Sequence, residues 1–189
     1  MKYERENKHM QHSGLTYIRR LPEIAVLLEH ADHIDVKTVI GSVDLRTFLA
    51  NMLSYQPDWI LALFGVRAVF VRFLGMRQSG MRRKQRSYHL TSENIPMQEG
   101  QRAMFFNVRM AREEQYWIAE VKDKHLDAIL GVVVEPLPGQ QQKRFHVLTV
   151  VYYRNWAGPV YFNVIRPFHH LVVGSMALAG VRKPGTGLL

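Results

Sequence analysis

The 189-residue sequence contains no cysteine, and this absence removes several kinds of chemistry. Disulfide bonds, thiolate nucleophiles and cysteine-ligated zinc sites are excluded. The sequence also lacks a run of about 18 uncharged apolar residues, the length expected of a membrane-spanning helix. Its most apolar stretch, residues 59–74, contains Arg67 and Arg72. The N-terminal residues are charged, so we predict no signal peptide and expect a cytoplasmic protein without a transmembrane segment.

Acidic residues are also scarce, since the chain has 16 Asp and Glu against 25 Lys and Arg, a net charge of +9. Such a charge favours anionic partners. Residues 59–92 contain no acidic residue at all. Within it, the basic segment from Arg77 to Arg86 is either a solvated basic loop or a contact for anionic lipid or RNA, and it lacks interleaved aromatic residues for stacking bases. The basic residues from 77 to 86 are Arg77, Arg82, Arg83, Lys84 and Arg86.

The hydrophobic content of 47% and charged content of 22% are those of an ordinary globular protein. We expect one domain at residues 21–181, preceded by a loose N-terminal arm at 1–20 and followed by a short tail at 182–189. No internal repeat and no interdomain linker is visible.

The first half of the domain carries helix and strand signals in alternation. Pro22 suits the first turn of a short helix over residues 21–28. Residues 33–39 alternate apolar and polar side chains, as a half-buried strand does. Ser42 or Asp44 can cap the helix that follows, and a further amphipathic helix is predicted over residues 59–74.

The second half of the domain reads as strands followed by one helix. Four apolar segments at residues 103–110, 115–122, 125–135 and 143–153 are separated by short polar or Gly/Pro turns, which predicts an antiparallel meander. A long helix begins near Pro159. This segregated order of strands and helices indicates an α+β fold.

The C-terminal segment contains an Asn, a Gly three residues later, a Tyr three residues further, and then Pro-Phe-His. This pattern resembles the signature of the DUF2867 family of uncharacterised proteins. The resemblance extends over about residues 33 to 180, and Arg154 stands where relatives often have His. The residues that carry it are Asn155, Gly158, Tyr161, Pro167, Phe168 and His169.

The DUF2867 family is similar to the START-like, helix-grip (SRPBCC) superfamily. That resemblance implies a curved antiparallel sheet wrapped around a long C-terminal helix, with a ligand cavity beneath the helix. In some relatives the module follows a nucleotide-binding domain. The present sequence has no GxGxxG motif after a strand, so no such domain is predicted.

Several residues are candidates for contact with a ligand in that cavity. Arg67 lies within an apolar helical stripe, where it either snorkels, pairs with an acid or meets a ligand. A helical wheel puts His169 at the edge of the apolar arc and His170 on the polar side. His169 either acts on a ligand or bonds a backbone carbonyl freed by Pro167. The predicted ligand-binding residues are Arg67, Tyr153, Tyr161, Phe168 and His169.

Other unusual residues are assigned structural roles. Asn155 is expected to form a cap or turn, Gly158 and Pro159 to begin the helix, and Pro167 to kink it. The cluster from His30 to Asp35 offers metal ligands, but no further ligand group accompanies it, so we predict no metal site and no cofactor. No motif of paired carboxylates or nucleophilic serine stands out, so no catalytic residue is assigned.

Three functions remain open on this basis. The first is the binding of a small hydrophobic or lipid-like ligand under the C-terminal helix. The second is an enzyme of the cyclase or hydratase type that uses His169 as general acid or base. The third is a surface-interaction protein that binds anionic lipid or RNA through the basic segment. The family resemblance favours the first, and the sequence does not identify the ligand.

Overall fold

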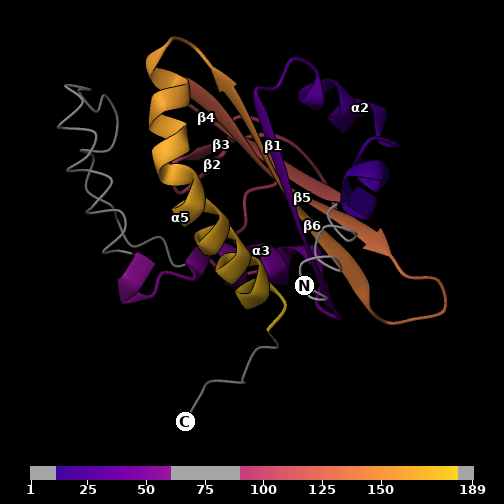
Figure 1. Ribbon diagram of the computed structural model, residues 1–189. Helices are drawn as coiled ribbons and strands as arrows, with labels where there is room; N and C mark the ends of the chain where they lie inside the picture. The colour runs from indigo at the N-terminus through magenta and orange to yellow at the C-terminus, as the bar shows by residue number, and fades with distance from the viewer. Residues whose placement is uncertain (1–11, 61–89, 183–189) are drawn as a thin grey trace, which may run out of the picture.

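The computed structural model describes residues 12–60 and 90–182. This part of the chain has an α+β fold, as predicted, with a six-stranded antiparallel sheet in the order β1-β6-β5-β4-β3-β2. Figure 1 shows the sheet between α2 on one side and α5 on the other, with α3 close to the C-terminal end of α5. The elements are α2 (Pro22–Ala25), η1 (Val26–Leu28), β1 (His33–Gly41), α3 (Leu45–Ser54), β2 (Arg102–Ala103), β3 (Phe106–Arg112), β4 (Tyr116–Lys122), β5 (Leu126–Pro136), β6 (Lys143–Tyr153) and α5 (Ala157–Gly180).

The sheet is the predicted meander of β3 to β6, extended by β1 at one edge. β1 pairs with β6 along its whole length, from His33 opposite Val151 to Gly41 opposite Lys143. Side chains of directly paired residues lie on the same face of a sheet. The β1–β6 pairing therefore places residues from the two halves of the sequence side by side on each face.

One face of the sheet is covered by the N-terminal helices. Residues 12–18 are helical, and Ile18 is fully buried together with Ile24 of α2. Both pack against strand residues such as Leu148. The structure differs here from the loose arm expected over residues 1–20, because Leu15 and Ile18 give this otherwise polar stretch an apolar side at helical spacing.

The other face of the sheet packs against α3 and α5. The ring of Phe48 in α3 stacks in parallel on Phe145 of β6, with ring centroids 4.3 Å apart. Trp117 of β4 is fully buried in the same cluster, and its indole N–H donates to the carbonyl of Pro96 at 2.9 Å. This layer fixes α3 and the C-terminal part of α5 on the sheet.

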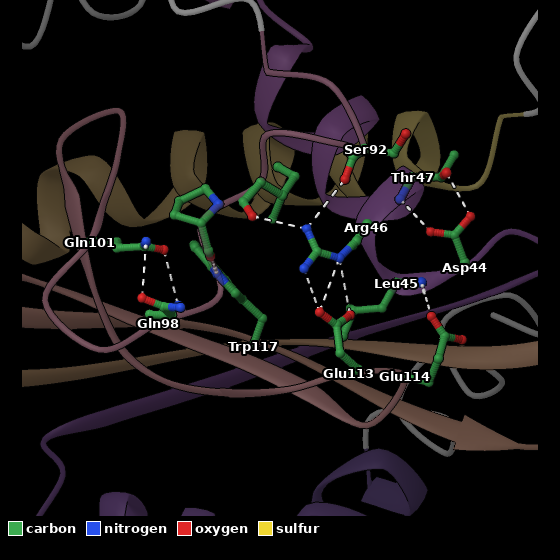
Figure 2. A network of polar contacts seen from close by, with 12 residues as sticks. Asp44, Leu45, Arg46, Thr47, Ser92, Gln98, Gln101, Glu113, Glu114 and Trp117 are labelled. Atoms are coloured by element: carbon green, nitrogen blue, oxygen red, sulfur yellow. Dashed lines mark hydrogen bonds and ion pairs between the residues drawn. The ribbon is translucent and has the colours of Figure 1, made fainter.

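The N-terminus of α3 is held by a network of polar contacts that Figure 2 shows. Asp44 is the N-cap, one of the two predicted caps, and accepts from the Thr47 N–H at 2.8 Å. Arg46 makes two contacts of 3.1 Å from Nε to the Glu113 carboxylate, and also donates to the Ile95 carbonyl at 3.2 Å. These bonds satisfy the charged groups and tie α3 to the β3–β4 turn.

The long helix α5 buries small residues near its C-terminal end and large ones near its N-terminal end. An added Cβ at Gly180 would lie 2.6 Å from the Phe48 ring, and Ala177 is fully buried, so small residues allow a close approach to α3 and the sheet. Tyr161 and Phe162 are buried in the first half of the helix. Phe168 and Leu171 lie on the outer side and are 45% and 57% exposed.

Residues 58–60 are helical, in agreement with the start of the predicted helix at 59–74. The rest of that helix, with Arg67, and the basic segment from Arg77 to Arg86 lie outside the described residues. Within the described ranges, no helix is both long and apolar enough to cross a membrane.

Candidate functional site

The corner between β6 and α5 sets the position of the helix over the sheet. The Asn155 side chain accepts from the Ala157 N–H at 3.1 Å and donates to the Lys124 carbonyl at 3.0 Å, so it joins this corner to the β4–β5 turn. An added Cβ at Gly158 would lie 2.6 Å from the His125 carbonyl oxygen. These local contacts explain why Asn and Gly occupy positions 155 and 158, and the explanation involves no ligand.

The polar residues of β1 lie beneath α5. His33, Asp35 and Lys37 alternate along the strand and so share one face. Asp35 is only 8% exposed. One carboxylate oxygen lies 3.4 Å from Lys37 Nζ, and the other lies 3.2 Å from Nδ1 of His170 on α5. The buried carboxylate thus links β1 to the helix above it.

Three buried polar atoms around Asp35 have no hydrogen-bond partner among the described residues: His33 Nε2, Thr149 Oγ1 and His169 Nε2. Thr149 is directly opposite Asp35 on β6 and is 5% exposed. The rings of His33 and His169 lie 6.2 and 6.1 Å from the His170 ring, measured between centroids. Buried polar groups are normally paired, so this unused hydrogen-bonding capacity marks a candidate site.

The imidazoles of His33 and His169 both favour the neutral form. Burial lowers the pKa of His169 to about 4, although Asp35 opposes the shift. Burial also lowers the pKa of His33, assisted by the charge of Arg166. A neutral imidazole has one N–H donor and one acceptor nitrogen. At neutral pH each ring can therefore donate one hydrogen bond and accept another.

An apolar cluster adjoins these polar atoms under the N-terminal half of α5. The Phe162 ring lies 4.7 Å from the His33 ring and 6.1 Å from the Tyr153 ring, between centroids. Tyr161 is buried in the same cluster with Val151 of β6. The site therefore combines a polar end with an apolar side.

A buried histidine on another part of the sheet has a partner for each of its two ring nitrogens, in contrast to His33 and His169. His146, on the opposite face of the sheet, is fully buried. Its Nδ1 lies 2.9 Å from Thr38 Oγ1, and its Nε2 lies 3.0 Å from a carboxylate oxygen of Glu135. Both ring nitrogens have protein partners, as do the charged groups around Arg46. These groups are explained by the fold, whereas His33, Thr149 and His169 are not.

The structure brings together some of the predicted ligand-binding residues and separates others. Tyr153 at the end of β6, together with Tyr161 and His169 of α5, lies within the site or its apolar side. Phe168 lies on the outer face of the helix, 45% exposed, and Arg67 is outside the described residues. The predicted partner of His169, a backbone carbonyl, does not satisfy its Nε2 among the described residues.

The two helix prolines have separate roles. Pro159 is in the first turn of α5, where a backbone N–H has no partner within the helix. Pro167 lies inside the helix, where it removes the N–H that would bond the Asn163 carbonyl. In Figure 1 the helix changes direction part-way along its length as it crosses the sheet.

Sequence reasoning missed most of the polar cluster: Asp35, Lys37, Thr149 and His170. The alternation in β1 predicts a half-buried strand, and it does not reveal that α5 covers the polar face. The helical wheel puts His170 on the polar side of the helix, whereas in the structure its ring bonds Asp35. The one available signal is the density of His and Asp in residues 30–35, which in the sequence suggests only metal ligands.

In chemical terms the cluster can bind a polar group and exchange protons with it. Two neutral imidazoles and one hydroxyl supply donors and acceptors, and Asp35 holds His170 in place. Among the described residues, no group of three or more His, Asp or Glu side chains is arranged to hold a metal ion.

Comparison with family models matches residues 27–176 to a family described as "Protein of unknown function (DUF2867)". The match covers most of the chain, so the chain belongs to this family. The whole polar cluster falls within the matched residues. No curated protein and no solved structure matches the chain.

Proposed function

We propose that this DUF2867 protein binds a small hydrophobic or lipid-like molecule beneath α5, with the polar end of the ligand at His33, Thr149 and His169. The observation that carries the proposal is the set of unpartnered buried atoms on these three residues. A ligand that bonds them would remove the cost of leaving them unsatisfied, about 1–3 kcal/mol for each group.

The position of the site supports an apolar ligand body. The apolar cluster of Phe162, Tyr161 and Val151 adjoins the polar atoms directly. Binding sites commonly join an apolar wall to a few convergent polar groups. The START-like, helix-grip architecture implied by the family resemblance agrees with this, since it would hold a ligand between the C-terminal helix and the sheet. That likeness of fold is a supporting analogy only.

Extraction of the purified chain with organic solvent, followed by mass spectrometry, tests the proposal. We expect a small apolar molecule in near-stoichiometric amount from the wild-type chain. The Thr149→Val variant should release much less, because the hydroxyl contact is lost without a change in side-chain shape. Phe168→Ala is the matched control, since Phe168 faces outward and should not affect retention. Extracts that equal those of an unrelated protein prepared in parallel would argue against binding.

A second candidate function is catalysis with His169 as general acid or base, in an enzyme of the cyclase or hydratase type. One observation favours it: the neutral His169 imidazole lies close to a second imidazole, His170, that is hydrogen-bonded to the Asp35 carboxylate, so groups able to move protons are adjacent. Incubation with a panel of small carbonyl compounds in D2O, followed by proton NMR, checks it. Exchange at carbon that His169→Gln abolishes is the expected result, and no exchange in the whole panel counts against it.

A further inference from the structure

The site under α5 has a charge pattern that narrows the class of ligand. We propose that the ligand is a small organic acid, whose carboxylate binds between His33, Thr149 and His169, and that its binding takes up a proton from solution. This inference rests on the proposed function, because it identifies the polar end of the ligand bound there.

The first argument is the supply of hydrogen-bond donors. Each neutral imidazole has one N–H, and the Thr149 hydroxyl has one O–H, so the three unpartnered groups can donate three bonds. An ionised carboxylate accepts bonds at both oxygens and donates none. It therefore suits a set of three donors better than an alcohol or an amine, which would bring donors of its own.

The second argument is the balance of charge. Both oxygens of the buried Asp35 carboxylate are occupied, one by Lys37 and one by His170. Arg166 on α5 adds a positive charge whose field reaches His33. The two imidazoles therefore have a permanent cation on each side, Arg166 acting on His33 and Lys37 acting on His169. A ligand anion between the rings is attracted by both cations, whereas a neutral polar group is not.

The third argument concerns the proton. The charged and titratable groups that act on His169 are Asp35, His170, His33 and Lys37. Without a ligand, burial keeps His169 neutral, and Asp35 alone favours its protonation. A carboxylate bonded to Nε2 would add a second nearby negative charge, which raises the pKa of the ring. Binding below that raised pKa therefore protonates His169 and forms a charge-assisted hydrogen bond.

The apolar part of the ligand follows from the neighbouring side chains. The Phe162 ring lies beside His33, and Val151 and Ile165 belong to the same apolar cluster. A short aliphatic or aromatic acid matches this pattern, because its apolar body would lie against these side chains while its carboxylate reaches Thr149. Octanoate is a suitable probe, and octanamide is its uncharged counterpart of equal length.

Isothermal titration calorimetry of the full chain with these two probes, at pH 6 and at pH 8, tests the inference. We expect octanoate to bind at least about 10-fold more tightly than octanamide at pH 6, since charge-assisted hydrogen bonds are roughly twice as strong as neutral ones. Octanoate affinity should fall from pH 6 to pH 8, and octanamide affinity should not. Titrations in two buffers of different ionisation enthalpy should reveal net proton uptake with octanoate only.

Variants assign the effect to residues. His169→Gln keeps a hydrogen-bonding side chain that cannot gain a proton, so octanoate should bind without proton uptake and without the dependence on pH. Thr149→Val should weaken octanoate at both pH values. Phe168→Ala should match the wild-type chain, and circular dichroism spectra should establish that all three variants are folded.

The possible failures are distinguishable. Equal binding of octanoate and octanamide would overturn the carboxylate inference and leave the proposed binding function standing. Binding of octanoate with no proton uptake would overturn the protonation step. If neither octanoate, octanamide nor the solvent extract of the purified chain gives evidence of a bound molecule, both the inference and the proposed function fail.

Discussion

The imidazole of His170 and the carboxylate of Asp35 lie 3.2 Å apart and connect α5 to the edge strand β1. The carboxylate is almost fully buried and has Lys37 as its other partner. Around this pair lie the polar atoms that have no partner in the described part of the chain. The contact is therefore both a support for the helix and the framework of the candidate site.

Asp35→Asn should lower the free energy of unfolding by about 1–3 kcal/mol. The reason is that Lys37 and His170 would no longer face a negatively charged partner. Urea denaturation at pH 7 measures the change. Asp127→Asn is the matched control: Asp127, near the start of β5, pairs with Arg154 at 2.7 Å, and its side chain is more exposed than that of Asp35. We expect a smaller effect there, and an equal or larger effect would show that the buried pair is not special.

Thr149→Val should stabilise the ligand-free protein by about 0.5–2 kcal/mol, since it removes a buried hydroxyl that no described residue satisfies. Thr38→Val is the same substitution on the opposite face of the sheet. It removes the bond to His146 and should destabilise the protein by about 1–2 kcal/mol. Thermal unfolding of both variants checks the pair, and a loss of stability with Thr149→Val would mean that its hydroxyl is satisfied.

Gly158→Ala should destabilise the protein by about 1–3 kcal/mol, because the new Cβ would press on the His125 carbonyl oxygen and push α5 from the sheet. Gly174→Ala lies in the same helix, and nothing is within 4 Å of its added Cβ. It should raise stability by about 0.5–1 kcal/mol through helix propensity alone. Chemical denaturation distinguishes them, and effects of equal sign would contradict the close approach at Gly158.

Acid should destabilise the protein partly through His169. Its pKa is about 4 in the folded protein, and about 6.5 in the unfolded chain, so the unfolded chain binds more protons between these values. Stability is therefore lost as the pH falls from about 6.5 to 4, on the order of 3 kcal/mol from this group. His169→Gln should flatten this part of the curve of unfolding free energy against pH. Phe168→Ala should retain it, and a His169→Gln curve parallel to the wild-type curve would contradict the burial of a neutral ring.

Much of the fold could be predicted because local signals and tertiary structure agree. Pro22 begins a helix, Asp44 caps the next one, and the turns between residues 103 and 153 separate the strands of the meander as expected. These features depend on neighbours in sequence. The exception is the helix at residues 12–18, whose apolar side is only a few residues wide.

The site is harder to predict than the fold, because it depends on which side of α5 packs against which face of the sheet. Alternation identifies β1 as a strand, but it does not reveal that α5 covers the polar face that contains Asp35. Likewise the helical wheel follows the large apolar residues of α5, while Gly158 and Gly180 decide which side approaches the sheet. Small residues and polar strand residues carry little hydrophobic signal, so the wheel placed His169 at an edge and His170 in water.

The link between His170 and Asp35 joins residues 135 positions apart in the chain. Closing a loop of that length costs entropy, which the long-range contact repays only after both of its ends are ordered. A chain that stops short of α5, or a partly folded chain, would have no site. A ligand bound here would therefore raise the free energy of unfolding of the complete fold by RT ln(1 + [L]/Kd). It would not stabilise a partly folded form that lacks the last helix.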